Sequence, residues 1–75
     1  MATPDPLLRA LGFALKRLRE SKRLTQEALA EKADLDRTYL SDIERGARNP
    51  GIKNVARLAK ALGVTTSQLL EGINE

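Results

Sequence analysis

Apolar residues recur along this chain at intervals of three and four positions, the spacing that places them on one face of an α-helix. The first such stripe comprises Leu7, Leu11, Ala14, Leu15 and Leu18. It predicts a helix from Leu7 to about Ser21, with Pro6 able to occupy the first turn and Asp5 able to cap it. Residues 1–6 contain two prolines and no apolar period, so we interpret them as an N-terminal arm.

Three later helix starts share one local pattern. In each, an apolar residue precedes a good capping residue and a second apolar residue follows four positions into the helix, forming a hydrophobic staple. The three patterns are Leu24-Thr25 with Leu29, Leu35-Asp36 with Leu40, and Val64-Thr65 with Leu69. They predict helices near residues 26–33, 37–45 and 66–71, the last with Gln68 completing a capping box. Gly46, Gly63 and Gly72 stand where a helix C-terminus favours a left-handed residue.

A further helix is predicted after the turn formed by Asn49, Pro50 and Gly51. Its apolar stripe is supplied by Ile52, Val55, Ala59 and Leu62. No stretch alternates with period two for long enough to suggest a strand. The pattern therefore predicts an all-α chain of five helices, with residues 7–75 forming a single domain.

The composition narrows the possible functions. The 75 residues include neither cysteine nor histidine, which removes disulfides, cysteine-ligated zinc, thiol nucleophiles and histidine bases. We therefore expect no enzyme, no metal and no cofactor. Thirteen basic against ten acidic residues give a net charge of +3, which is compatible with a nucleic-acid partner. No apolar run approaches the roughly 20 residues of a membrane span, and no secretory signal pattern is present, so we expect a cytoplasmic protein that does not bind membranes.

The third predicted helix has a polar face suited to recognition. It follows the second predicted helix after a connection of about three residues, the geometry of a helix-turn-helix, whose second helix enters the DNA major groove. Leu40 and Ile43 point to one side of this helix. The opposite side carries hydrogen-bonding groups, which are Thr38, Ser41, Asp42 and Arg45, with Arg37 at the N-terminal end.

Residues 24–30 (LTQEALA) and 35–46 (LDRTYLSDIERG) closely resemble the phage repressor and Cro type of helix-turn-helix, the Xre class. Within that class, residues 36–39 (DRTY), 43–46 (IERG) and 48–50 (RNP) look most like the controller proteins of restriction-modification systems. The resemblance implies a compact five-helix bundle of the lambda-repressor-like type. It also implies a sequence-specific transcriptional regulator that binds double-stranded DNA at a palindromic or near-palindromic operator as a homodimer.

The resemblance assigns roles to individual residues. The positions that match base-contacting residues are Arg37, Thr38 and Ser41. The positions that match phosphate-contacting residues are Thr25, Gln26, Tyr39, Arg45, Arg48 and Asn49. Tyr39 is equally compatible with a core role, Thr25 with a plain helix cap, and Asp42 either accepts from cytosine or orients a neighbouring arginine. Arg19 and Glu44 match a partly buried ion pair that links the first and third helices of such folds.

Two further surfaces are candidates for protein contacts. Glu27 and Glu31 lie four apart on one helix face, which is usually a solvated face, but activating members of the class contact the RNA polymerase sigma subunit with acidic residues at these positions. The C-terminal residues Val64, Leu69, Leu70 and Ile73 exceed what a short helix needs for one core. We expect part of this surface to form a dimer interface; the alternative is that all four close the core of the monomer.

Controllers of this type resemble concentration switches, which activate at low concentration and repress at high concentration. A phage repressor, a Cro protein or an antitoxin-type autoregulator presents nearly the same residues. An alternative from another class is a protein-interaction or membrane-surface module built on the first helix. Its basic amphipathic pattern consists of Lys16, Arg17, Arg19, Lys22 and Arg23.

Overall fold

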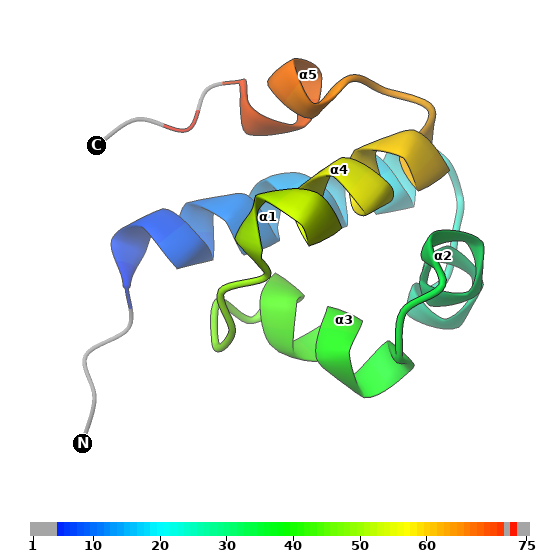
Figure 1. Cartoon of the computed structure of the whole chain (residues 1–75), viewed down its shortest axis with the longest axis horizontal. Helices are drawn as coiled ribbons and strands as arrows, with labels where there is room; N and C mark the ends of the chain where they lie inside the picture. Colours follow the sequence, from blue (N-terminus) through cyan, green and yellow to red (C-terminus); the bar gives the residue numbers. More distant parts are fainter. Residues whose placement is uncertain (1–4, 72, 74–75) are drawn as a thin grey trace.

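A computed structural model describes residues 5–71 and residue 73, and this part of the chain contains five α-helices and no strand. The helices are α1 (Pro6–Ser21), α2 (Gln26–Ala33), α3 (Arg37–Glu44), α4 (Gly51–Leu62) and α5 (Thr66–Leu70) (Figure 1). The predicted all-α fold is confirmed, and the predicted helix ends agree with the observed ones to within one residue. Of the predicted arm, residues 1–4 lie outside the described residues, while Pro6 is the first residue of α1.

The predicted caps start four of the five helices. Asp5 Oδ1 accepts a hydrogen bond from the amide of Leu7 at 2.8 Å, and Thr25 and Asp36 cap α2 and α3 in the same way. Thr65 and Gln68 form the predicted capping box at α5, with reciprocal bonds of 2.8 and 3.0 Å. These local bonds satisfy amide groups that have no partner within the helix.

The helix ends follow the predicted glycines at two positions. Gly46 and Gly63 adopt left-handed conformations, with φ of 76° and 75°. Gly72 lies outside the described residues. At the end of α2 the left-handed residue is Asp34, with φ of 58°, which the glycine pattern did not reveal. Asp and Asn tolerate this conformation better than most side chains.

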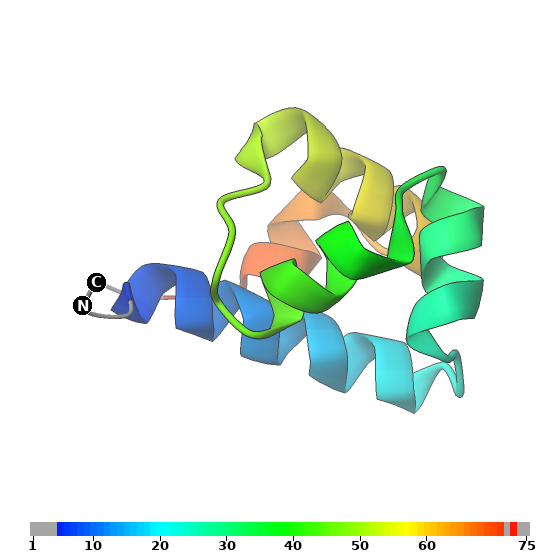
Figure 2. The same cartoon turned by 90° about the horizontal axis from the view of Figure 1, so that it is seen from below.

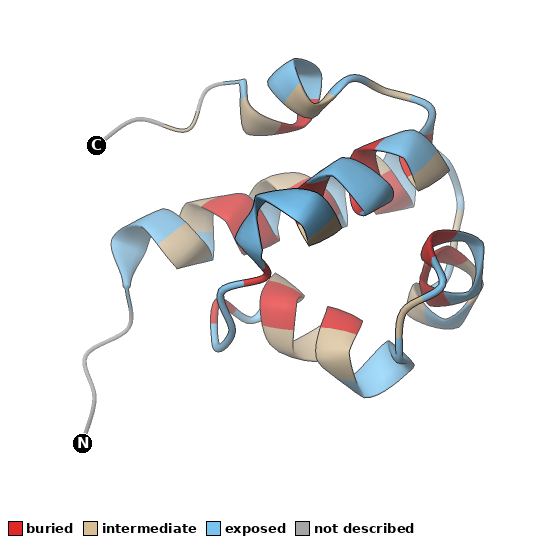
Figure 3. Ribbon diagram, in the orientation of Figure 1, coloured by how far each residue is buried: buried red, intermediate tan, exposed pale blue. Residues whose placement is uncertain are grey.

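The core lies between all five helices. Its largest fully buried side chains are Leu15, Leu29, Leu40, Ile43, Leu58 and Leu69. Figure 3 shows buried segments on the inward sides of α1, α2, α3 and α4, with exposed segments outside. The prediction is wrong for two residues of the apolar stripes, which do not face the core: Ile52 is 67% exposed and Leu7 is 42% exposed. Leu58, which the predicted stripe of α4 omitted, takes the inward position instead.

Gly12 brings α1 against the end of α3. A Cβ atom at this position would lie 2.5 Å from the carbonyl oxygens of both Ile43 and Glu44. No side chain fits at that distance, so the glycine fixes how closely α3 approaches α1. In Figure 2, α3 lies in front of α4 and α5, which leaves its outward face open.

Candidate nucleic-acid interface

The outward face of α3 presents the polar residues that the sequence singled out. Leu40 and Ile43 are fully buried, whereas Arg37, Thr38 and Arg45 are exposed. Ser41 and Asp42 are half-buried. Burial of one side of α3 thus leaves a row of hydrogen-bonding side chains on the other, as predicted.

The turn between α2 and α3 is short and held by backbone bonds. Asp34 ends α2 in its left-handed conformation, and the amide of Leu35 donates to the carbonyl oxygen of Ala30 at 2.8 Å. Asp36 Oδ1 then accepts from the amide of Thr38 at 2.7 Å and starts α3. The N-terminal turn of α3 therefore begins with Arg37 and Thr38, the two residues expected to reach bases first.

A buried ion pair anchors this unit to α1. Arg19 Nε donates to Glu44 Oε2 at 2.7 Å, and a second guanidinium nitrogen donates to Oε1 at 3.0 Å. Arg19 also donates to the carbonyl oxygen of Leu24 at 2.8 Å. The hydrogen bond to Glu44 raises the pKa of Arg19 and outweighs the opposing effect of burial. This confirms the predicted ion pair and removes Arg19 from the exposed basic face of α1.

The N-terminal end of α2 is tied to the same ion pair. Gln26 Nε2 donates to Glu44 Oε1 at 2.9 Å, and Thr25 Oγ1 accepts from the amide of Ala28 at 3.0 Å. Thr25 is therefore a helix cap, and Gln26 is held in place by α3. Their contact with phosphate stays a prediction, favoured by the general affinity of helix N-termini for anions.

Asp42 lies at the centre of a cluster beyond the first turn of α3. One carboxylate oxygen bonds to Arg45 and the other lies 3.7 Å from the guanidinium group of Arg48. Arg48 in turn lies over the ring of Tyr39, 5.1 Å from its centroid. Of the two roles left open for Asp42, orientation of a neighbouring arginine is the one seen here.

Tyr39 takes the core role, and its contact with phosphate stays a prediction. Its ring packs against the core, and its hydroxyl accepts from Asn54 Nδ2 at 3.0 Å and donates to the carbonyl oxygen of Pro50 at 3.4 Å. Sequence reasoning missed Asn54, because the contact joins residues on two helices. Asn49, predicted to contact phosphate, accepts from the amide of Gly51 at 3.0 Å and shapes the entry to α4.

The predicted dimer residues divide into two groups. Leu69 is 1% exposed, so it belongs to the core of the protomer and is removed from the expected interface. Val64, Leu70 and Ile73 are half-buried. Leu70 and Ile73 line a shallow hollow that is mostly apolar, together with Leu7, Leu8, Leu11, Asn49, Gly51, Ile52 and Val55. The exposed side chains of Leu7 and Ile52 therefore lie around the same hollow as the C-terminal residues.

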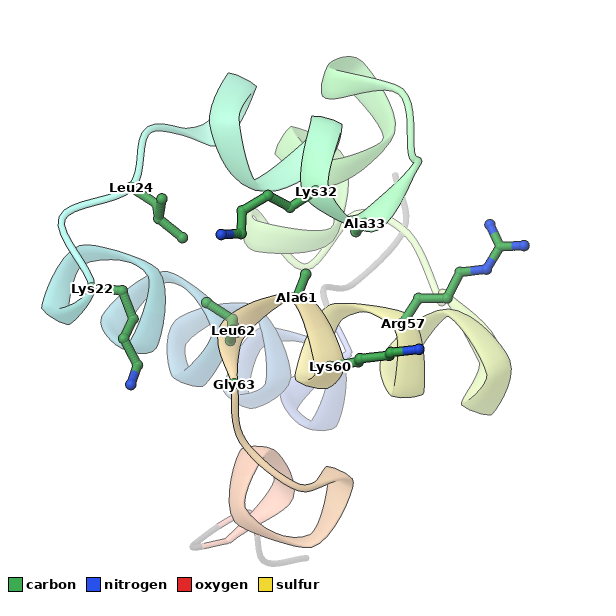
Figure 4. A pocket seen from close by; sticks show the side chains of 9 residues that line it. All are labelled: Lys22, Leu24, Lys32, Ala33, Arg57, Lys60, Ala61, Leu62 and Gly63. Atoms are coloured by element: carbon green, nitrogen blue, oxygen red, sulfur yellow. The ribbon is translucent and has the colours of Figure 1, made fainter.

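A second basic surface, which sequence reasoning did not identify, lies between the C-terminal ends of α2 and α4. We call it the basic groove, and it is lined by Lys22, Leu24, Lys32, Ala33, Arg57, Lys60, Ala61, Leu62 and Gly63. Its volume is about 740 Å³. Figure 4 shows the Lys32 side chain over the groove, while Arg57 and Lys60 extend away from it. None of its lining residues belongs to the predicted DNA contacts.

The two acidic residues predicted to contact a protein partner, and one aromatic residue of α1, lie on the surface. Glu27 and Glu31 are exposed on α2 and line a shallow hollow that Arg37 also borders. On α1, Phe13 is 63% exposed, with Arg17 above its ring at 5.8 Å from the centroid. No described helix is long and apolar enough to cross a membrane. Within the described residues, acidic side chains do not gather into a metal-binding group of three or more.

Comparison with known proteins decides the family. The helix-turn-helix family model matches residues 15–69, which include all of α2, α3 and α4, most of α5 and the C-terminal part of α1. The chain belongs to the helix-turn-helix family. Within this helix-turn-helix family, it is 48% identical over 61 residues to the control protein C.BamHI of Bacillus amyloliquefaciens, covering 80% of this chain and 75% of that protein.

Two further relatives have similar descriptions. The chain is 45% identical over 65 residues to the control protein C.MunI of a Mycoplasma species, covering 85% of this chain and 88% of that one. Among solved structures, it is similar to the restriction-modification controller C.Esp1396I, captured as a tetramer on its natural 35-base-pair operator. That match has a TM-score of 0.82 and 43% identity, and it covers 89% of this chain and 88% of that one. The fold that carries the candidate interface is thus shared with the solved structure of C.Esp1396I.

Proposed function

We propose that this protein is a sequence-specific DNA-binding transcriptional regulator of the restriction-modification controller type. The observation that carries the proposal is the exposed polar row on α3, held in a helix-turn-helix by the buried pair of Arg19 and Glu44. The related controller C.Esp1396I binds its operator as a tetramer, which supports the same use of this surface. The absence of cysteine and histidine supports a binding role over a catalytic one.

We assign base contacts to Arg37, Thr38 and Ser41. Arg37 is exposed at the N-terminal end of α3, where it can donate two parallel hydrogen bonds to O6 and N7 of guanine. The hydroxyl of Thr38 can donate or accept, and its methyl group suits thymine. Within the described residues, none of these three side chains takes part in a hydrogen bond of the protein, so their donors are available to a ligand.

Phosphate contacts are assigned to the residues that border this row. They are Thr25, Gln26, Tyr39, Arg45, Arg48 and Asn49. Two of them, Arg45 and Arg48, carry exposed guanidinium groups beside the C-terminal half of α3. Thr25, Gln26 and Asn49 stand at the starts of α2 and α4, and half-buried Tyr39 lies on α3 beside Arg48. Such contacts position a protein on the duplex without reading its sequence.

The protein is proposed to act as a homodimer on a palindromic or near-palindromic operator. The surface that supports this is the apolar hollow around Leu7, Ile52, Leu70 and Ile73. Half-buried Val64 stays part of the proposed interface, whereas buried Leu69 is excluded. A domain of this size gains only about 3–5 kcal/mol from a single core, so burial of these side chains in a dimer would add stability. A two-fold dimer would also set two α3 helices roughly 34 Å apart, one turn of DNA.

Substitution of Ile52 tests the dimer surface. Ile52→Lys places a charge in the apolar hollow and should convert the dimer to a monomer in sedimentation analysis at micromolar concentration. Phe13→Lys is the matched control, because Phe13 is equally exposed but lies outside the hollow. A dimer that survives Ile52→Lys, or dissociates only with Phe13→Lys, would place the interface elsewhere.

The proposed regulatory behaviour is activation at low concentration and repression at high concentration, in the cytoplasm, where the operator DNA is found. Activation requires contact with the transcription machinery, for which the exposed acids Glu27 and Glu31 are the proposed site toward the sigma subunit of RNA polymerase. The double change Glu27→Lys, Glu31→Lys should preserve operator binding and abolish activation in a reporter assay. Unchanged activation, or loss of DNA binding, would contradict this role.

The deciding experiment for the proposed function is selection of binding sites from a random duplex library. Wild-type protein should enrich an inverted repeat whose half-site centres lie about one helical turn apart. Arg37→Ala should enrich sites in which the base preference at one step of each half-site is relaxed. Salt-sensitive binding without any enriched sequence would overturn the proposal and favour the alternative of a nonspecific basic surface on α1.

A further inference from the structure

Asp42 places a negative charge inside the surface that is proposed to meet DNA phosphates. Its side chain is 21% exposed, while those of its partners Arg45 and Arg48 are 63% and 54% exposed. Asp42 bonds to Arg45 through one oxygen and faces Arg48 through the other at 3.7 Å. The Asp42 carboxylate is therefore paired with two guanidinium groups, which would otherwise be directed at solvent or at phosphate.

We propose that Asp42 is a specificity-determining residue that competes with phosphate for Arg45 and Arg48 and thereby lowers affinity for non-operator DNA more than affinity for the operator. This inference rests on the proposed DNA-binding function. Asp42 acts through the two arginines and is thus a positioning residue. It touches no base in this assignment.

The competition matters most on DNA of arbitrary sequence. Nonspecific binding is almost entirely electrostatic, because it depends on neutralised phosphates and the counterions they release. Arg45, Arg48 and Asp42 together carry a net charge of +1, where the arginines alone would carry +2. A carboxylate close to phosphate is also repelled by it. Both effects weaken nonspecific binding directly.

On the operator, the same carboxylate has a compensating effect. Base contacts fix the register of α3, so the phosphates near Arg45 and Arg48 take defined positions. A guanidinium group has five N–H donors, which allows each arginine to bond Asp42 and a phosphate together. The arginines are then held before DNA arrives, and less side-chain entropy is lost on binding.

Arg48 has a second partner besides Asp42. Its guanidinium group lies 3.7 Å from the Asp42 carboxylate and over the ring of Tyr39, 5.1 Å from the centroid. Tyr39 is itself fixed by Asn54 and by the carbonyl oxygen of Pro50. This chain of contacts orients a guanidinium group toward one place, which is useful only when the phosphate lies at that place. Preorganisation therefore offsets the repulsion on the operator and not on other DNA.

The test removes the charge of Asp42 and retains its shape. Asp42→Asn and wild type are titrated with the duplex enriched in the selection and with a scrambled duplex, across salt concentrations from about 50 to 200 mM, a range over which phosphate contacts strongly change affinity. For the scrambled duplex, the variant should bind several-fold more tightly, and its salt slope should steepen by about one unit, as expected for one more neutralised phosphate. Affinity for the enriched duplex should change less, so the ratio of affinity for the enriched duplex to affinity for the scrambled duplex falls.

Asp34→Asn is the matched control. It makes the same change in net charge, from +3 to +4, at an exposed residue that ends α2 away from the cluster, and asparagine suits the left-handed conformation there. It should leave the ratio of affinities at the wild-type value. Urea unfolding of both variants checks that each is folded during the titrations.

Several outcomes would overturn the inference. They are equal gains on both duplexes, unchanged affinity for the scrambled duplex, weaker binding to both duplexes, or the same fall in the ratio with Asp34→Asn. Failure of the proposed function would look different, because wild type would then bind the enriched and scrambled duplexes equally.

Discussion

Two basic surfaces of this protein hold their positive charges in different surroundings. The recognition surface, formed by the outward face of α3 and the loop after it, carries Arg37, Arg45 and Arg48. The basic groove carries Lys22, Lys32, Arg57 and Lys60. A count of cations alone would select the groove as the site for DNA.

The helix ends explain why the count misleads. The groove is built at the C-terminal ends of α2 and α4 and at the residue that ends α1. Exposed carbonyl groups give such ends a partial negative charge, and cations there stabilise the helix itself. The recognition surface includes the N-terminal end of α3, where Arg37 stands and where amide groups favour an anionic ligand. This difference applies to Arg37 and not to Arg45 and Arg48, which stand at and after the C-terminal end of α3.

The two surfaces also differ in how their side chains are held. Arg45 and Arg48 have a carboxylate between them, and Arg48 has an aromatic partner. Among the described residues, no acidic group lies within 4 Å of a groove cation. We therefore expect substitutions at the recognition surface to have larger and more specific effects than those in the groove.

The largest expected effect is that of Glu44→Ala. It leaves Arg19 buried without its partner, and breaking such a pair costs about 3–5 kcal/mol of unfolding free energy. Urea unfolding followed by circular dichroism measures this loss. Lys60→Ala in the groove should stay within about 0.5 kcal/mol of wild type, as is usual for exposed positions.

A double variant separates stability from function at the same site. Arg19→Met with Glu44→Leu replaces the ion pair by apolar side chains and should recover most of the lost stability. It also removes the oxygen that holds Gln26, so operator affinity should remain below wild type. Full recovery of operator affinity would show that the link between α2 and α3 is not needed for binding.

Arg37→Ala should have the next largest effect, now on binding. Loss of a bidentate contact to guanine costs about 1–3 kcal/mol, or roughly 5- to 150-fold in operator affinity. Fluorescence anisotropy with the enriched duplex measures the change. Arg57→Ala removes the same side chain from the groove and should leave the preference for that duplex intact. Equal losses with both variants would mean that the groove takes part in recognition.

Substitution of one glycine near each surface compares how backbone changes affect DNA binding. Gly12→Ala inserts a methyl group against the carbonyl oxygens of Ile43 and Glu44, which should cost about 1–3 kcal/mol and displace α3. Gly63→Ala, at the edge of the groove, meets no atom within 4 Å but has a φ of 75°, which costs about 1–2 kcal/mol. Only Gly12→Ala should weaken operator binding once binding is measured under conditions where both variants are fully folded.

The smallest expected effect is that of Lys32→Ala in the groove. If the groove faces away from DNA, the salt slope of operator binding should change by less than about 0.5 units, against about 0.9 for each phosphate contact that is lost. Arg48→Ala is the positive control, with a loss of about one unit. A full unit lost with Lys32→Ala would extend the DNA surface to the C-terminal end of α2.

Local features of this fold follow closely from the sequence. The caps Asp5, Thr25, Asp36 and Thr65 act within three residues of their own positions, so their hydrogen bonds can be inferred from neighbouring residues. The polar row on α3 is equally local, because the burial of Leu40 and Ile43 determines which side faces outward.

Features that join distant segments were less accessible. Periodicity grouped Leu7, Ile52 and Leu69 with the apolar residues of their helices, but it does not show which neighbour covers each one. Leu69 is covered by the protomer itself, whereas Leu7 and Ile52 are not. The contact of Tyr39 with Asn54 and the convergence of three helix ends at the groove also depend on how the helices pack. The pair of Arg19 and Glu44 was expected only through resemblance to the family.

The division of α3 into a buried side and an outward polar side has a consequence for the evolution of binding preference. The residues that hold the helix are Leu40, Ile43 and Glu44, and the side chains proposed to read bases share none of their contacts. Exchanging Arg37, Thr38 or Ser41 should therefore change the preferred DNA sequence with little loss of stability. New regulators with different targets can arise from this scaffold by a few substitutions on one helix, while the frame that supports them is inherited unchanged.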